Sequence, residues 1–110
     1  MFVLKTNHEF WWPVTVRVPM DNGEYARSTF RVRYRLPDKD EMKQLARLAG
    51  DDAENTRKVV VDWADVKNET KEDVPFSPEA LDTMLGVPWI RVAIWQTFID
   101  ASFGIVRKNS

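Results

Sequence analysis

Two stretches of the N-terminal half alternate apolar and polar residues, as strands do when they bury one face of a sheet. The first begins near Pro13, ends at Pro19 and places Val14, Val16 and Val18 on one face. The second runs from about Tyr25 to Leu36 and places Phe30, Val32, Tyr34 and Leu36 on its apolar face. Asn22-Gly23, a strong hairpin signal, lies between the two runs. The pattern therefore predicts an antiparallel hairpin, whereas residues 1–12 carry no clean pattern.

Helical periodicity begins after Pro37. Asp38 and Glu41 resemble a capping box, and Gly50 suits a helix C-terminus, which predicts a helix over about Asp38–Ala49. Its apolar stripe comprises Met42, Leu45, Ala46 and Ala49. Asp51 or Asp52 then begins a second predicted helix that extends through about Val60.

The β-branched run Val59–Val61 leaves a strand as the alternative at the end of this second helix. Trp63 is expected to pack onto the core, and residues 67–73 form a charged loop.

The C-terminal third predicts a short helix followed by a long apolar one. Ser77 is a strong N-cap before Pro78, and Gly86 closes the short helix. The long helix is predicted over about Pro88–Phe103. At 100° per residue, its first apolar stripe comprises Ile90, Ile94, Phe98 and Ala101. A second apolar stripe comprises Val92, Trp95, Ile99 and Phe103.

These elements together predict a single α+β domain over residues 1–110. A small antiparallel hairpin or sheet in the N-terminal half packs against three to four helices, the last of them the long apolar C-terminal helix. Residues 105–110 are predicted to be a flexible basic tail.

The composition of the chain excludes several classes of protein. The chain carries no cysteine, which removes disulfides and thiolate chemistry and suits a reducing cytoplasm. No signal peptide or apolar run of membrane-spanning length is recognisable, so a cytoplasmic, non-membrane protein is expected. The formal net charge of −1 does not indicate a polyanion-binding chain.

Candidate catalytic chemistry is sparse. The single histidine, His8, lies in the unassigned N-terminal segment and has no nucleophile motif to serve. Two groups of acidic residues have neither histidine partners nor the spacing of a calcium loop; they are Asp51, Asp52 and Glu54, and Asp62 and Asp65. The chain also lacks a glycine-rich phosphate loop. We therefore expect no catalytic residues, no metal and no cofactor.

The second predicted strand has a basic polar face. Its arginines are Arg27, Arg31, Arg33 and Arg35, and Arg17 on the neighbouring strand extends the face. Beside Trp11, Trp12 and Tyr25, this face suits single-stranded nucleic acid or an acidic protein. The near balance of 17 acidic and 16 basic residues favours the alternative, a solvent face neutralised by neighbouring acids.

The aromatic surplus points to protein binding instead. Five tryptophans in 110 residues is a high count, and aromatic residues dominate interface hot spots. Two apolar stripes on the long helix exceed what one thin sheet covers. The predicted contact residues for a partner or a second copy are Trp89, Val92, Trp95, Phe98, Ile99 and Phe103.

Five segments of the chain resemble small tail assembly chaperones of long-tailed bacteriophages and prophages. They are VVDWADVK (60–67), VPFS (74–77), LDTML (81–85), PWI (88–90) and RKN (107–109). The hairpin, the strand FRVRYRL (30–36) and the acid-rich start of the first helix also agree with that family.

The resemblance implies a non-enzymatic protein that acts in the bacterial host cytoplasm. It implies binding to the tape measure protein, a long and largely helical chain, and assistance to tail-tube assembly, with self-association possible. Two alternatives from other classes are a single-stranded nucleic-acid-binding module and a small structural tail or connector protein.

Overall fold

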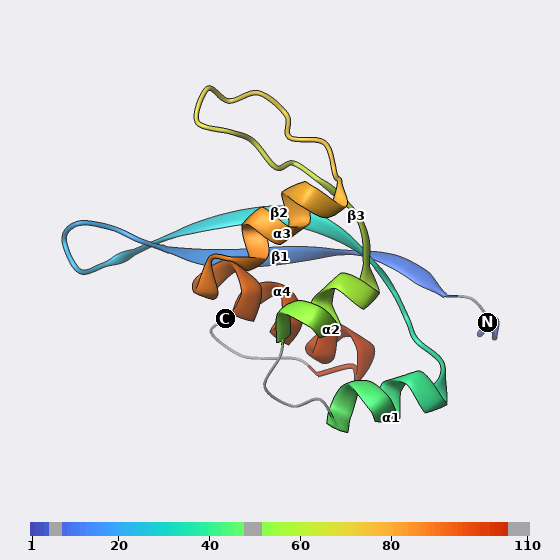
Figure 1. The fold of residues 1–110 in the computed structure, drawn as a ribbon. Coiled ribbons are helices and arrows are strands. Elements are labelled where there is room, and N and C mark those ends of the chain that lie inside the picture. The colour runs from blue at the N-terminus through green and yellow to red at the C-terminus, as the bar shows by residue number, and fades with distance from the viewer. Residues whose placement is uncertain (5–7, 48–51, 106–110) are drawn as a thin grey trace.

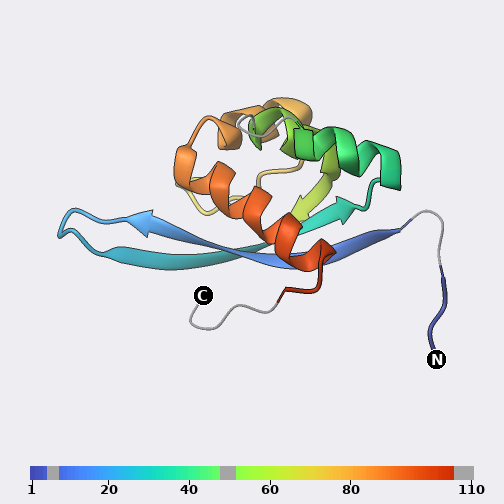
Figure 2. The same cartoon turned by 90° about the horizontal axis from the view of Figure 1, so that it is seen from below.

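The computed structural model describes residues 1–4, 8–47 and 52–105. The elements in chain order are β1 (Glu9–Pro19), β2 (Tyr25–Arg35), α1 (Lys39–Arg47), α2 (Asp52–Val59), β3 (Val60–Ala64), α3 (Pro78–Leu85) and α4 (Pro88–Ser102). The strands form one antiparallel sheet in the order β1-β2-β3. All four helices lie on one face of this sheet (Figures 1 and 2). The α+β fold predicted from the sequence is confirmed.

The β1–β2 hairpin keeps one register along its whole length, from Glu9 opposite Arg35 to Pro19 opposite Tyr25. At one end the Leu36 N–H donates to the His8 carbonyl, and at the other the Met20 N–H donates to the Glu24 carbonyl, both at 2.8 Å. Both bonds join even-numbered residues, so even-numbered residues bond across the hairpin. Odd-numbered residues direct their N–H and C=O groups to the two outer edges.

This register explains why Pro13 is tolerated inside a strand. Pro13 is odd-numbered and lies on β1, the edge strand, so its missing N–H removes no bond within the sheet. The strand therefore continues through Pro13 and begins at Glu9. Phe10, Trp11 and Trp12, which the sequence pattern left unassigned, belong to β1.

The run at Val59–Val61 divides between a helix and a strand. Helix α2 ends at Val59, one residue before the predicted end near Val60, and β3 begins at Val60, so the strand alternative holds for Val60 and Val61. Val59 and Val60 are both buried, because the change of element carries the chain directly from the helical layer into the sheet. Strand β3 pairs with only part of β2, from Arg31 to Tyr34.

Trp63 on β3 is buried, as predicted. Its indole N–H donates to the Val74 carbonyl at 2.7 Å, and Phe76 packs edge-on against its ring. These contacts attach the segment before α3 to the sheet.

The termini of the helices follow the sequence signals. Asp38 caps α1 by accepting a hydrogen bond from the Glu41 N–H at 2.8 Å, and Ser77 caps α3 by accepting one from the Ala80 N–H at 3.0 Å. Helix α4 begins at Pro88 and ends at Ser102, with Phe103 as its C-cap. The predicted termini at Ala49, Gly50 and Asp51 lie outside the described residues, as does the tail from residue 106.

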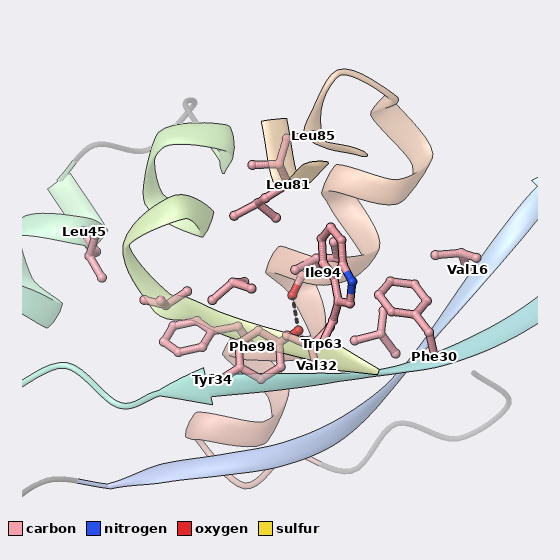
Figure 3. Packing of buried hydrophobic residues seen from close by; sticks show 13 residues of the cluster. Val16, Phe30, Val32, Tyr34, Leu45, Trp63, Leu81, Leu85, Ile94 and Phe98 are labelled. Atoms are coloured by element: carbon pink, nitrogen blue, oxygen red, sulfur yellow. Dashed lines mark hydrogen bonds between the residues drawn. The ribbon is translucent and has the colours of Figure 1, made fainter. Parts of the chain in front are cut away.

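The core lies between the inner face of the sheet and the helices (Figure 3). Its side chains come from every layer: Val14, Val16, Phe30, Val32, Tyr34, Leu45, Val59, Val60, Trp63, Leu81, Leu85, Ile94 and Phe98. Leu36, which alternation placed on the inner face, follows the end of β2 and is exposed.

The hairpin extends well past the helices (Figure 1). We call residues 17–27, the loop and the last pairs of β1 and β2, the hairpin arm. Strand β3 stops short of the arm, because it ends at Ala64 opposite Arg31 and Asp65 turns away in a left-handed conformation with φ of 67°.

Candidate functional site: a groove between α1 and α4

The two apolar stripes of α4 have different environments. Ile94 and Phe98 of the first stripe have no exposed surface and face the sheet (Figure 3). The Phe98 ring packs against Tyr34 with 5.5 Å between ring centroids. Phe98 was predicted as a partner-contacting residue, and that prediction is wrong, because a fully buried side chain has no surface to offer.

The second stripe is only partly covered. Trp95 and Ile99 are half-buried, whereas 52% of Val92 and 64% of Phe103 are exposed. The Trp95 ring stacks on Phe98 at 5.3 Å, so its inner side rests on the core while its outer side remains accessible. The sheet therefore accounts for the first stripe and leaves the second for other contacts.

Helix α1 lies beside this second stripe, and the two helices enclose a groove of about 380 Å³. We call this the α1–α4 groove. Its lining residues are Lys39, Met42, Lys43 and Leu45 from α1, and Trp95, Ile99 and Phe103 from α4. Lys39 and Lys43 are four residues apart and thus neighbours on one face of α1. They add two cationic groups to a lining that is otherwise apolar.

An ion pair holds α1 in this position. The Arg35 guanidinium at the end of β2 donates to both carboxylate oxygens of Glu41, at 3.0 and 2.5 Å. These hydrogen bonds lower the pKa of Glu41 and raise that of Arg35. Because both side chains are about one-third exposed, the pair orients α1 on the sheet more than it stabilises the fold.

The groove gathers three of the six predicted contact residues, Trp95, Ile99 and Phe103. Val92 is exposed but lies outside the groove lining, and Trp89 is half-buried and packs against the core. The sequence assigned Met42 and Leu45 to a buried stripe and did not predict their place in the groove. Periodicity identifies the apolar face of a helix but not which part of that face a neighbouring helix leaves open.

Three of the five arginines on the basic face of the sheet form ion pairs, and the other two lie on the hairpin arm. Three arginines have carboxylate partners: Arg31 with Asp65 at 2.8 Å, Arg33 with Glu9 at 2.9 Å, and Arg35 with Glu41. Arg31 also lies over the Trp11 ring, 5.7 Å from its centroid. Arg17 and Arg27 lie directly opposite each other on the hairpin arm. The five predicted basic residues thus form a mostly neutralised face rather than one continuous cationic surface.

The described residues do not assemble a recognisable reaction centre. His8 is exposed and stacks on Phe10 at 5.7 Å between ring centroids. Within residues 1–4, 8–47 and 52–105, no group of three or more histidine, cysteine or acidic side chains lies close enough to hold a metal ion. The α1–α4 groove offers apolar contact and two lysine ammonium groups.

A scan against protein-family models and searches of curated proteins and of solved structures find no match to this chain. No helix in the described part of the chain combines the length and the apolar character needed to cross a membrane.

Proposed function

We propose that this protein is a non-enzymatic phage tail assembly chaperone that holds an apolar helical segment of the tape measure protein in the α1–α4 groove. The observation that carries the proposal is the partly uncovered second stripe of α4, which Met42 and Leu45 of α1 extend into a groove. The resemblance of segments 60–67, 74–77, 81–85 and 88–90 to tail assembly chaperones supports the identity of the client.

The groove suits a helix that carries apolar residues on one face. Its volume of about 380 Å³ falls within the usual range of ligand-binding clefts, and apolar side chains dominate its lining. Methionine and aromatic side chains adapt to varied apolar partners, which matches a client with many similar helical segments. Covering such segments in the bacterial host cytoplasm keeps the client soluble until tail-tube subunits assemble around it.

Co-expression with the client tests this proposal. The client is the long coiled-coil protein that a neighbouring gene is expected to encode. We expect the wild-type chain to keep a fragment of it soluble and to co-purify with it. The double variant Met42→Glu/Phe103→Glu should fold, because Phe103 is exposed and Met42 is only partly buried, but should lose the client.

Val92→Glu is the matched control. It places the same charge on an exposed apolar position of α4 that lies outside the groove lining. It should retain the client. Equal recovery of the client with the double variant and with the wild type would overturn the proposed surface.

A further inference from the structure

The hairpin arm carries two arginines, Arg17 and Arg27, that have no ion-pair partner among the described residues. Asp100 of α4 lines the same surface pocket as Arg17 but forms no ion pair with it. Arg17 and Arg27 are partners in the β1–β2 register and both are exposed. The other arginines on the same face each form an ion pair; they are Arg31, Arg33 and Arg35. Like charges directly opposite each other destabilise a strand pair, so the fold alone does not account for this arrangement.

The outer side of the backbone beside Arg27 also has no pairing partner within the described residues. Odd-numbered residues of β2 direct their N–H and C=O groups away from β1, and β3 pairs with β2 only from Arg31 to Tyr34. Tyr25, Arg27 and Thr29 therefore present an open strand edge. An unpaired edge of this kind is a template for an additional strand.

The opposite edge of the hairpin is protected. Pro13 and Pro19 are odd-numbered residues of β1, so two of the outward positions on that edge carry no N–H group. No proline interrupts β2 between Tyr25 and Arg35. The two edges of the hairpin thus differ, and only the β2 edge offers an uninterrupted row of donors and acceptors.

We propose that the β2 edge at residues 25–29 binds an extended acidic segment of a partner protein as an added strand. Backbone hydrogen bonds to Tyr25, Arg27 and Thr29 would hold the segment, as in other cases of strand addition. Side chains on one face of the added strand alternate with period two. An acid at every second position therefore places one carboxylate beside Arg27, within reach of the cationic pair.

Charge argues against a second copy of this chain as the occupant. Two copies paired through the same edges around Arg27 would bring their Arg27 side chains together, beside the Arg17 side chains of both copies. That arrangement doubles the like-charge repulsion already present across the hairpin. An acidic strand relieves the repulsion instead.

Nucleic acid also fits this edge less well than a peptide does. Phosphate oxygens accept hydrogen bonds but donate none, so they would leave the outward carbonyls of the edge unpaired. The acidic residues Asp21 and Glu24 lie in the hairpin loop, and Asp65 occupies the other end of the face, paired with Arg31. An extended peptide satisfies both the donors and the acceptors of the edge.

A peptide titration followed by amide NMR tests this inference on the full chain. The probe is an octapeptide in which glutamate alternates with threonine, and its control replaces each glutamate with glutamine. We expect the acidic peptide to shift the amide signals of Tyr25, Arg27 and Thr29 and to slow their hydrogen exchange. The control peptide should bind at least about tenfold more weakly, because charge-assisted hydrogen bonds are lost.

Two variants and one control distinguish the contribution of the arginine charges from that of the backbone edge. Arg17→Gln/Arg27→Gln should weaken binding by about tenfold or more, while Lys58→Gln/Lys67→Gln removes the same charge elsewhere and should change it little. Thr29→Pro keeps both arginines and removes one outward N–H, as Pro13 does on the opposite edge, and should also weaken binding. Retained amide dispersion verifies that each variant is folded.

Five outcomes would overturn the inference. The first four are undiminished binding by the Arg17→Gln/Arg27→Gln variant, undiminished binding by Thr29→Pro, peptide-induced shifts confined to the α1–α4 groove, and tighter binding of a fifteen-residue oligothymidylate than of the acidic peptide. Protection of residues 25–29 through dimerisation in the absence of peptide would assign the edge to a second copy and would likewise overturn it. None of these measurements uses the tape measure client or a substitution in the α1–α4 groove, so the proposal of chaperone function is tested separately.

Discussion

The hydroxyl group of Tyr34 donates a 2.8 Å hydrogen bond to the main-chain carbonyl of Ile94 (Figure 3). Both residues are fully buried, and the bond joins the middle strand of the sheet to the middle of α4. This bond fixes where α4 lies on the sheet, and it thereby fixes the position of the second stripe, which lines the α1–α4 groove.

Tyr34→Phe removes this bond while it preserves the ring. We expect a loss of about 1 kcal/mol in the free energy of unfolding, measured by urea denaturation at pH 7. Tyr25→Phe is the control, because Tyr25 is exposed and should be almost neutral. A Tyr34→Phe variant as stable as the wild type would show that the bond contributes nothing net.

The same residue makes stability depend on alkaline pH. Burial raises the pKa of Tyr34 far above its ordinary value of 10.0. A group with a raised folded-state pKa contributes stability that is intact below its unfolded pKa and declines above it. The wild type should therefore lose up to about 1.4 kcal/mol per pH unit above pH 10 relative to Tyr34→Phe. Unfolding curves of both proteins between pH 8 and 11.5 measure this difference, and parallel curves would contradict it.

Glu41→Gln tests the ion pair that positions α1. The pKa of Glu41 is lowered in the folded state, so the pair stabilises above the unfolded pKa and loses its contribution as pH falls through the folded pKa. We expect a loss of about 0.5 kcal/mol at pH 7 that becomes smaller as the pH falls below the unfolded pKa, measured by urea unfolding. Glu69→Gln in the loop after β3 removes the same charge and is the control. A loss that does not change with falling pH would point to packing rather than charge.

Ser77→Ala removes the N-cap of α3. The Ala80 N–H then loses its acceptor, and we expect a loss of about 1 kcal/mol in thermal or urea unfolding. Ser77→Asp retains a capping acceptor and should restore most of that loss. If both variants are equally destabilised, the contribution of Ser77 is not that of a cap.

Phe98→Ala should separate the two stripes of α4. Because Phe98 is fully buried against Tyr34 and Trp95, its truncation should cost about 3–5 kcal/mol. Val92→Ala on the same helix should cost less than about 0.5 kcal/mol, since the side chain is half exposed. Comparable losses for both variants, measured by calorimetry, would contradict the arrangement of α4 on the sheet.

Local signals in the sequence predicted the elements whose causes are local. The alternation around Val14–Val18 and Phe30–Tyr34 gave the hairpin, and Ser77 with Pro78 marked the start of α3. Strand β3 was left as an alternative because a short β-branched run suits both a helix end and a strand. Pairing with β2 makes Val60–Ala64 a strand, and this partner strand lies about thirty residues earlier in the chain.

The residues of the candidate site were harder to predict, because tertiary contacts determine which of them are exposed. Both stripes of α4 were visible in the sequence, but only packing against Tyr34 showed that Phe98 is part of the core. The arginine face was equally visible, yet the acid that neutralises Arg31 is Asp65, which reaches it only through the pairing of β3 with β2. Helical periodicity at residues 38–49 could not show that Met42 would face Trp95 and Ile99 across a groove.

The helices cover only one end of the hairpin, which makes the length of the arm independent of the rest of the fold. Facing residues of β1 and β2 beyond Val18 and Ala26 could be inserted or deleted in pairs, two in each strand, without a change in which side chains face the core. Natural variants of this architecture are thus free to lengthen or shorten the arm in such steps. The distance between the groove and whatever the arm contacts would then be set by strand length alone, at about 3.3 Å per residue.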